Sequence, residues 1–145
     1  GLVPGLELPA TLYADMGGSL MATEAVLQAA LHKGQGLYLE VALSDAAGYL
    51  ALPRQWGLTQ PAGAVGGAHA GYRVYPCRDG GVAVAALEPH FAAALCQAAG
   101  VAASDMRAMF APATHAGVAA FLAGQTRAEL DRLAVERDIP LHTMA

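Results

Sequence analysis

The chain has few basic residues and few cysteines, and it lacks a long uninterrupted apolar segment. Its 145 residues include eight Lys and Arg against twelve Asp and Glu, a net charge of −4 that disfavours nucleic acid or an anionic membrane surface as a partner. No stretch reaches the roughly 20 apolar residues that a membrane-spanning helix needs. The two cysteines, Cys77 and Cys96, do not make a disulfide framework. With no signal peptide visible after Gly1, we expect a cytoplasmic protein.

Motifs of several common enzyme classes are missing as well. The histidines form neither HxH nor HExxH, so we expect no metal site. The glycine pairs Gly66-Gly67 and Gly80-Gly81 fit neither a P-loop nor a dinucleotide-binding GxGxxG turn, and no serine lies in a GxSxG sequence. We therefore expect no tightly bound cofactor.

Hydrophobic residues make up 55% of the chain, which is enough to fill a core. Periodicity and turn signals predict an α/β fold. The predicted helices cover residues 16–33, 46–52, 89–99, 105–110, 115–122 and 127–137, and the predicted strands cover 37–43, 72–75, 82–87 and 141–144. Proline and glycine are frequent in residues 58–71, so this stretch is the best candidate for a loop or linker between two domains. We predict a helix–strand–helix segment in residues 1–60 and a small α+β domain with an antiparallel hairpin in residues 61–145.

Short local signals predict where these elements begin and end. The first helix is apolar almost all round, which is typical of a buried helix. Ser44-Asp45 predicts the cap of the second helix, and Pro53 predicts its end. Asp79-Gly80 predicts a hairpin turn. Glu88-Pro89 predicts the start of a helix that Gly100 ends.

Three further signals lie nearer the end of the sequence. Ser104 could cap the segment 105–110. Thr126 and Glu129 have the spacing of a capping box, which predicts the start of helix 127–137, and Pro140 predicts its end.

Asp15 is the first candidate for a catalytic residue. It is the one acid in an apolar run, and Gly17 and Gly18 follow it closely. A carboxylate at this place can cap a helix, and it can also be presented to a substrate, where the helix N-terminus favours its charged form. Such a group suits nucleophilic attack on an acyl carbonyl or proton abstraction. Glycines beside it would let a ligand approach the backbone closely, so Gly17 and Gly18 are candidate ligand contacts.

Three other residues could carry chemistry. Glu88 ends an apolar strand and opens a helix; it is either an ordinary helix-opening residue or a group that orients a catalytic acid or base. His69 lies in the glycine-rich loop, where we expect a solvent-exposed residue and where a substrate contact is conceivable. Cys77 stands beside Arg78, which could make the thiol somewhat reactive, although a structural thiol is the plainer interpretation.

Four blocks in order resemble the class III CoA-transferases, the CaiB/BaiF family, which includes the 2-methylacyl-CoA racemases. Residues 12–21, LYADMGGSLM, resemble the family's catalytic-aspartate segment, and residues 34–47, GQGLYLEVALSDAA, resemble its next block. Gly66-Gly67 through Tyr72-Arg73-Val74-Tyr75 and Asp79-Gly80 resembles its hairpin, and residues 84–91, VAALEPHF, resemble its EP block. Residues 101–145 match more loosely. Each block alone is weak, and the ordered set is specific.

The resemblance implies an acyl-CoA-handling enzyme with Asp15 as the catalytic aspartate and Glu88 as a second site residue. In the transferases the aspartate attacks the acyl-CoA carbonyl, forms a mixed anhydride and then an aspartyl-CoA thioester. In the racemases it helps to move the α-proton, and a glutamate at the place of Glu88 supports the partner histidine. The implied substrates are an acyl-CoA and a carboxylic acid, with Gly17, Gly18 and His69 as candidate contacts for the coenzyme A thioester. We put CoA transfer first and racemisation second.

The sequence also departs from the family pattern. Family members have a long Rossmann-like half before the catalytic aspartate, which carries most of the CoA-binding surface and the racemase histidine. Residues 1–60 would then be a large-domain segment carrying the aspartate. The stretch Gly67–Tyr72 lacks the proline usual after the glycines. Since family chains interlock as dimers, we expect a homodimer or a complex with a chain that carries the N-terminal half. A non-catalytic truncated or isolated domain is the remaining alternative.

Overall fold

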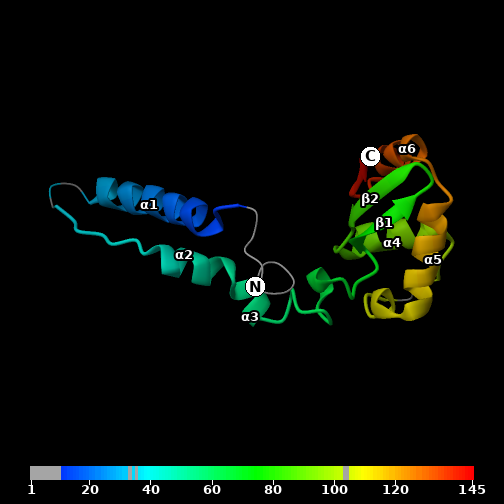
Figure 1. Cartoon of the computed structure of the whole chain (residues 1–145), viewed down its shortest axis with the longest axis horizontal. Coiled ribbons are helices and arrows are strands. Elements are labelled where there is room, and N and C mark those ends of the chain that lie inside the picture. Colours follow the sequence, from blue (N-terminus) through cyan, green and yellow to red (C-terminus); the bar gives the residue numbers. More distant parts are fainter. Residues whose placement is uncertain (1–10, 33, 35, 103–104) are drawn as a thin grey trace. The chain divides into compact units, whose positions relative to one another are not determined.

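The computed structural model describes residues 11–32, 34, 36–102 and 105–145. The chain divides into two compact units, Gly1–Gly57 and Leu58–Ala145 (Figure 1). The combination of helices with a three-stranded antiparallel sheet confirms the predicted α/β class. Assigning the first unit to a larger domain stays a prediction.

The described part of the first unit contains three helices, α1 (Tyr13–Leu31), α2 (Leu43–Leu50) and α3 (Leu52–Gln55). α1 packs on α2 at its two glycines. A Cβ atom on Gly17 would lie 3.3 Å from Ala46 Cβ, and one on Gly18 would lie 2.5 Å from Leu43 Cδ2. The absence of side chains at Gly17 and Gly18 therefore lets the two helices approach closely.

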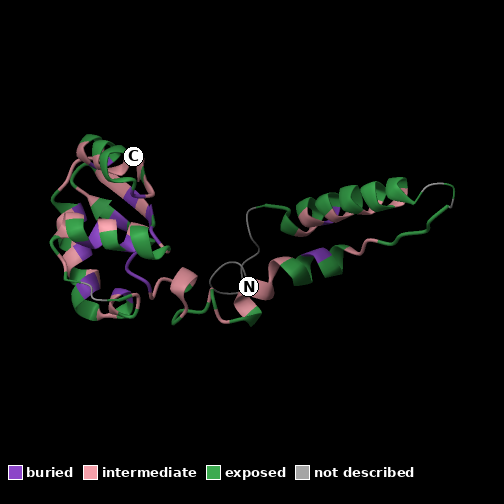
Figure 2. Ribbon diagram, turned by 180° about the vertical axis from the view of Figure 1, so that it is seen from behind, coloured by how far each residue is buried: buried purple, intermediate pink, exposed green. Residues whose placement is uncertain are grey.

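The prediction of a buried first helix is wrong for the structure described. Gly18 is the buried residue of α1, while Leu20 and Leu31 are 74% and 81% exposed. Figure 2 shows that most of this helix is exposed. The short α2 covers the glycine side of α1 and leaves the other apolar side chains in contact with solvent.

The predicted strand 37–43 is also wrong. Residues 36–42 pair with no strand in the described part of the chain, because the sheet consists of three strands of the second unit. α2 begins at Leu43, so Ser44 and Asp45 lie in its first turn and Ala42 occupies the N-cap. Pro53 does not end this helix; it lies near the start of α3, where a missing N–H costs nothing.

The second unit holds the sheet and most of the buried residues (Figure 2). The hairpin strands β1 (Tyr72–Cys77) and β2 (Gly80–Ala85) confirm the predicted hairpin, and β3 (Leu141–Met144) confirms the predicted last strand. β2 is the central strand, antiparallel to both neighbours, with Tyr75 opposite Val82 and Val84 opposite Leu141. The remaining elements are η1 (Ala64–Gly66), α4 (Pro89–Ala99), η2 (Ala108–Phe110), α5 (Pro112–Ala123) and α6 (Arg127–Arg137).

One face of the sheet and the helices beside it form the core. Along β2 the side chains of Val82 and Val84 are buried while that of Ala85 is exposed, the alternation of a strand with one covered face. The buried side chains that meet there include Tyr75, Val82, Val84, Ala92, Leu95, Cys96, Met109, Val118, Leu122 and Leu130.

Helix ends in the second unit follow the local signals closely. α4 begins after Glu88 and ends at Gly100, whose φ of +66° suits glycine. Thr126 accepts a hydrogen bond from the Glu129 N–H at 3.3 Å, and Glu129 Oε2 accepts one from the Thr126 N–H at 2.7 Å, so the capping box is confirmed. Asp138, with φ +50°, ends α6 two residues before Pro140. The predicted cap at Ser104 lies outside the described residues.

Candidate functional site

Asp15 lies in the first turn of α1 and is exposed. The prediction that it caps this helix is wrong: Leu12 occupies the N-cap and no side chain caps the turn. The Met16 N–H donates to the Leu12 carbonyl at 2.9 Å, which closes the first turn before Asp15 could act as a cap. The carboxylate still interacts favourably with the positive end of the helix dipole.

The surroundings of Asp15 leave its carboxylate available. Among the described residues no Lys, Arg or His lies within ion-pair distance of it. The Ser19 hydroxyl donates to the Asp15 backbone carbonyl at 2.9 Å and not to the side chain. Gly17 and Gly18 face α2, so their contact with a ligand stays a prediction. The first turn of α1 thus presents the Asp15 carboxylate to solvent.

Glu88 belongs to the second unit, at the N-cap of α4. It is exposed and its side chain makes no capping hydrogen bond. Its carbonyl accepts a hydrogen bond from the Ala92 N–H at 2.9 Å. Pro89 fixes the first helical position. The carboxylate is therefore unengaged among the described residues, and its catalytic role stays a prediction.

His69 is not the exposed loop residue that the sequence predicts, because it is 1% exposed. Its Nδ1 accepts a hydrogen bond from the Gly71 N–H at 3.0 Å, and its ring packs T-shaped on Phe110 with centroids 5.3 Å apart. Burial lowers the pKa of His69 below its usual value, and His115 lowers it further. No local signal in the sequence indicates this enclosure, because Phe110, which packs on the ring, is distant along the chain.

Cys77 is partly buried. The Arg78 guanidinium donates to the Gly124 carbonyl. The neighbour of the Cys77 sulfur is instead a carboxylate oxygen, Oδ1 of Asp79, at 3.8 Å. Cys96 is buried, and burial raises the pKa of its thiol. A structural role suits both thiols.

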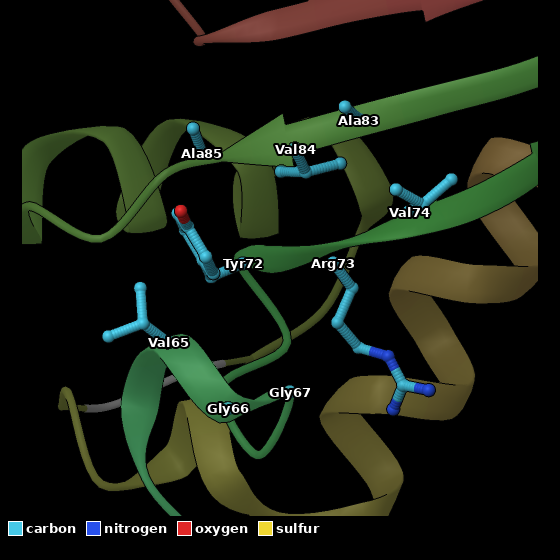
Figure 3. Close-up of a pocket in the computed structure, with 9 residues that line it drawn as sticks. All are labelled: Val65, Gly66, Gly67, Tyr72, Arg73, Val74, Ala83, Val84 and Ala85. Carbon is cyan, nitrogen blue, oxygen red and sulfur yellow. The ribbon is translucent and has the colours of Figure 1, made fainter. Parts of the chain in front are cut away.

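Each unit has an open groove on its surface. The groove of the second unit has a volume of about 530 Å³ and lies between the turn Val65–Gly67 and the hairpin (Figure 3). It is mainly apolar, with Tyr72 and the guanidinium of Arg73 as its polar side chains. The groove of the first unit, about 340 Å³, lies between α1 and residues 37–41, and neither groove includes Asp15.

Comparison with protein-family models shows which family the chain belongs to. The family model of CoA-transferase family III matches residues 7–145. The chain belongs to this family. The match confirms the resemblance drawn from the four ordered blocks and places the chain in a family of CoA-handling enzymes. No curated protein sequence matches the chain.

The structure of this family III member was searched for metal-binding clusters and for membrane-spanning helices. Among the described residues, no three His, Cys, Asp or Glu side chains are grouped so that they could hold a metal ion. In the same part of the chain no helix is long and apolar enough to cross a membrane.

Proposed function

We propose that this family III chain handles acyl-CoA thioesters and transfers CoA between carboxylic acids, with Asp15 as the nucleophile. The observation that carries the proposal is the exposed, unpaired carboxylate in the first turn of α1. A carboxylate without an ion-pair partner keeps its lone pairs for attack on a carbonyl carbon. The family supplies the substrate class, and the residue supplies the chemistry.

The proposed reaction begins with attack of an Asp15 oxygen on the acyl-CoA carbonyl. The thioester bond breaks, CoA leaves as a thiolate, and a mixed anhydride joins the acyl group to Asp15. The CoA thiolate then attacks the aspartyl carbonyl of that anhydride, which releases the first carboxylic acid and leaves an aspartyl-CoA thioester. The acceptor carboxylate reverses the two steps: it attacks the aspartyl carbonyl, and CoA returns to the new acyl group.

The helix that carries Asp15 favours this role. The first-turn N–H groups of α1 stabilise negative charge on the carboxylate between turnovers. The hydrogen bond from Ser19 to the Asp15 carbonyl fixes the backbone around the nucleophile. Gly17 and Gly18 pack on α2 and so hold the helix that carries Asp15 against its neighbour.

Isotope transfer tests the proposed nucleophile directly. With an acceptor acid labelled with heavy oxygen in its carboxylate, each turnover leaves one labelled oxygen on the Asp15 carboxylate, because the bridging oxygen of the second anhydride comes from the acceptor. Mass spectrometry of the proteolytic peptide that contains Asp15 measures this label. The assay uses the full protein under turnover conditions.

Two variants sharpen the test. Asp15→Asn removes the nucleophile and should lower the transfer rate at least about a thousandfold, with no label in the peptide. Asp45→Asn is the matched control, since Asp45 is also an exposed acid in the first turn of a helix and should keep both rate and label. Transfer that continues in Asp15→Asn, or label that never reaches Asp15, contradicts the proposal.

Racemisation of a 2-methylacyl-CoA is the second candidate, favoured by the resemblance of the Glu88 block to the racemase branch. Deuterium uptake at the α-carbon from heavy water measures it. Uptake that is lost in Asp15→Asn supports an acid–base role for Asp15. If the full protein catalyses neither transfer nor exchange, the non-catalytic alternative replaces both.

A further inference from the structure

The segment Ala68–Tyr72, between η1 and β1, is held in place by hydrogen bonds from several elements. The Ala70 N–H donates to the Met109 carbonyl at 2.9 Å, and the Tyr75 hydroxyl donates to the Ala70 carbonyl at 2.7 Å. Further contacts are Ala86 N–H to Gly71 O at 2.7 Å, Tyr72 N–H to His69 O at 2.9 Å, and His115 Nε2 to Ala68 O at 2.8 Å. The backbone of this segment therefore has few conformations open to it.

His69 is the buried titratable group at the centre of the segment. Because Nδ1 accepts the hydrogen bond from the Gly71 N–H, the neutral ring carries its proton on Nε2. Nε2 is buried and has no hydrogen-bond partner among the described residues. The ring is thus fixed in one tautomer and enclosed on its other side.

A second proton on this ring would have to occupy Nδ1. Nδ1 would then point a donor at the Gly71 N–H, 3.0 Å away, and the hydrogen bond would become a contact between two donors. The same proton would create a buried cation, and no described carboxylate lies within ion-pair distance of His69. Burying an unpaired charge costs free energy, so the protonated form of His69 is disfavoured while the segment Ala68–Tyr72 is closed.

The charged and titratable groups around His69 do not relieve this conflict. From α5, His115 contacts the same segment and its own charge would repel a cation on His69. From β1, Tyr75 uses its hydroxyl on Ala70, and the guanidinium of Arg73 lies over the Tyr75 ring, 5.9 Å from its centroid. η2 and β2 contain no charged residue, and η2 contributes the ring of Phe110.

We propose that His69 is a pH-sensitive switch in the fold: protonation of Nδ1 breaks its hydrogen bond with the Gly71 N–H and opens the segment Ala68–Tyr72. The proposal does not depend on the CoA-transfer reaction. Burial and His115 hold the pKa of His69 below 6.5, whereas an open segment would let it return toward that value. The closed state therefore binds fewer protons than the open one. The segment is most stable above pH 6.5 and loses stability as the pH falls below it.

Amide hydrogen exchange on the full chain tests the switch. Because opening takes up one proton, the protection factors of Ala70, Gly71 and Tyr72 should fall by up to about tenfold for each pH unit below the usual His pKa. The Leu130 amide, bonded to the Thr126 carbonyl in α6, is the internal control and should keep its protection factor. Equal protection of the segment at all pH values through the titration of His69 would overturn the proposal.

Two variants separate His69 from its neighbour. The side chain in His69→Gln cannot titrate, so the decrease of the protection factors at low pH should disappear. In His115→Gln the decrease should remain. Persistence of the fall in His69→Gln overturns the proposal. If His69→Gln does not fold, nitrogen NMR of the wild-type imidazole takes its place: unprotonated Nδ1 in the closed state, with a protonation midpoint that coincides with the fall, supports the switch, and a midpoint separate from the fall overturns it.

Discussion

Replacement of Gly71 by alanine should destabilise the second unit, because the segment Ala68–Tyr72 has no room for a side chain at this position. Gly71 is buried, and its φ is not in the left-handed region, so the backbone itself would tolerate a side chain. The neighbouring atoms, however, leave no space for a Cβ atom. A Cβ on Gly71 would lie 2.4 Å from the backbone oxygen of Ala86 and 3.0 Å from Cε1 of His69. The Ala86 oxygen belongs to the backbone, so relief of the clash requires the segment or the end of β2 to move.

The cost follows from the contacts that such a shift would break. The Gly71 carbonyl accepts from Ala86 N–H at 2.7 Å, and its N–H donates to His69, two hydrogen bonds worth about 1 kcal/mol each. Overpacking adds about 1–3 kcal/mol. The lower entropy of an unfolded chain with alanine offsets about 0.5–1 kcal/mol. The free energy of unfolding should therefore decrease by about 2–4 kcal/mol.

Urea unfolding, followed through the near-ultraviolet circular dichroism of the buried Tyr75, measures this loss. Gly67→Ala is the matched control. A Cβ there meets nothing within 4 Å, but its φ of +102° is unfavourable for alanine, so that variant carries a backbone penalty of about 1–2 kcal/mol without a clash. If Gly71→Ala loses no more stability than Gly67→Ala, the steric reasoning is refuted.

Two further predictions concern hydrogen bonds of the same unit. Thr126→Ala should cost about 1 kcal/mol in urea unfolding by removing the cap of α6. Hydrogen bonds from Thr126 lower the pKa of Glu129 below its usual 4.5, so wild-type stability should fall as the pH drops below 4.5 and Glu129→Gln should flatten that part of the curve; an unchanged slope contradicts this. Tyr75→Phe should cost about 1 kcal/mol, because the Ala70 carbonyl loses a buried partner; equal midpoints for variant and wild type would contradict it.

The parts of the fold that the sequence predicted correctly depend on local signals. The Thr126–Glu129 spacing marks a helix start because both partners lie within one turn. Gly100 marks a helix end through its own backbone conformation, and the turn at Asp79-Gly80 joins strands that are adjacent in sequence. None of these features needs a distant residue.

The errors concern features that depend on other parts of the molecule. Residues 37–43 have the composition of a strand, but a strand requires a partner, and none is present among the described residues. Asp is a residue type preferred at helix caps, but α1 begins earlier, at Tyr13, so Asp15 lies in its first turn. The burial of His69 depends on Phe110, far along the chain. No local pattern contains that contact.

For the candidate site as well, some features could be predicted from the sequence and others only from the structure. Asp15 and Glu88 could be found from the sequence because each is an acid isolated in an apolar run that begins a helix. The packing of Gly17 and Gly18 on α2 could not be found, because it is known only once the second helix is placed. The resemblance to family III makes Asp15 the candidate catalytic aspartate, and its exposure in the first turn of α1 could come only from the structure.

The order of the strands has a consequence for synthesis of the protein. β2 is the central strand, and its first partner, β1, is adjacent in sequence and available at once. Its second partner, β3, is translated only after α4, α5 and α6. During that interval the open edge of β2 is a template for another chain, and Val82 and Val84 lack part of their cover. Aggregation during translation should therefore depend on how soon β3 follows the three helices and pairs with β2.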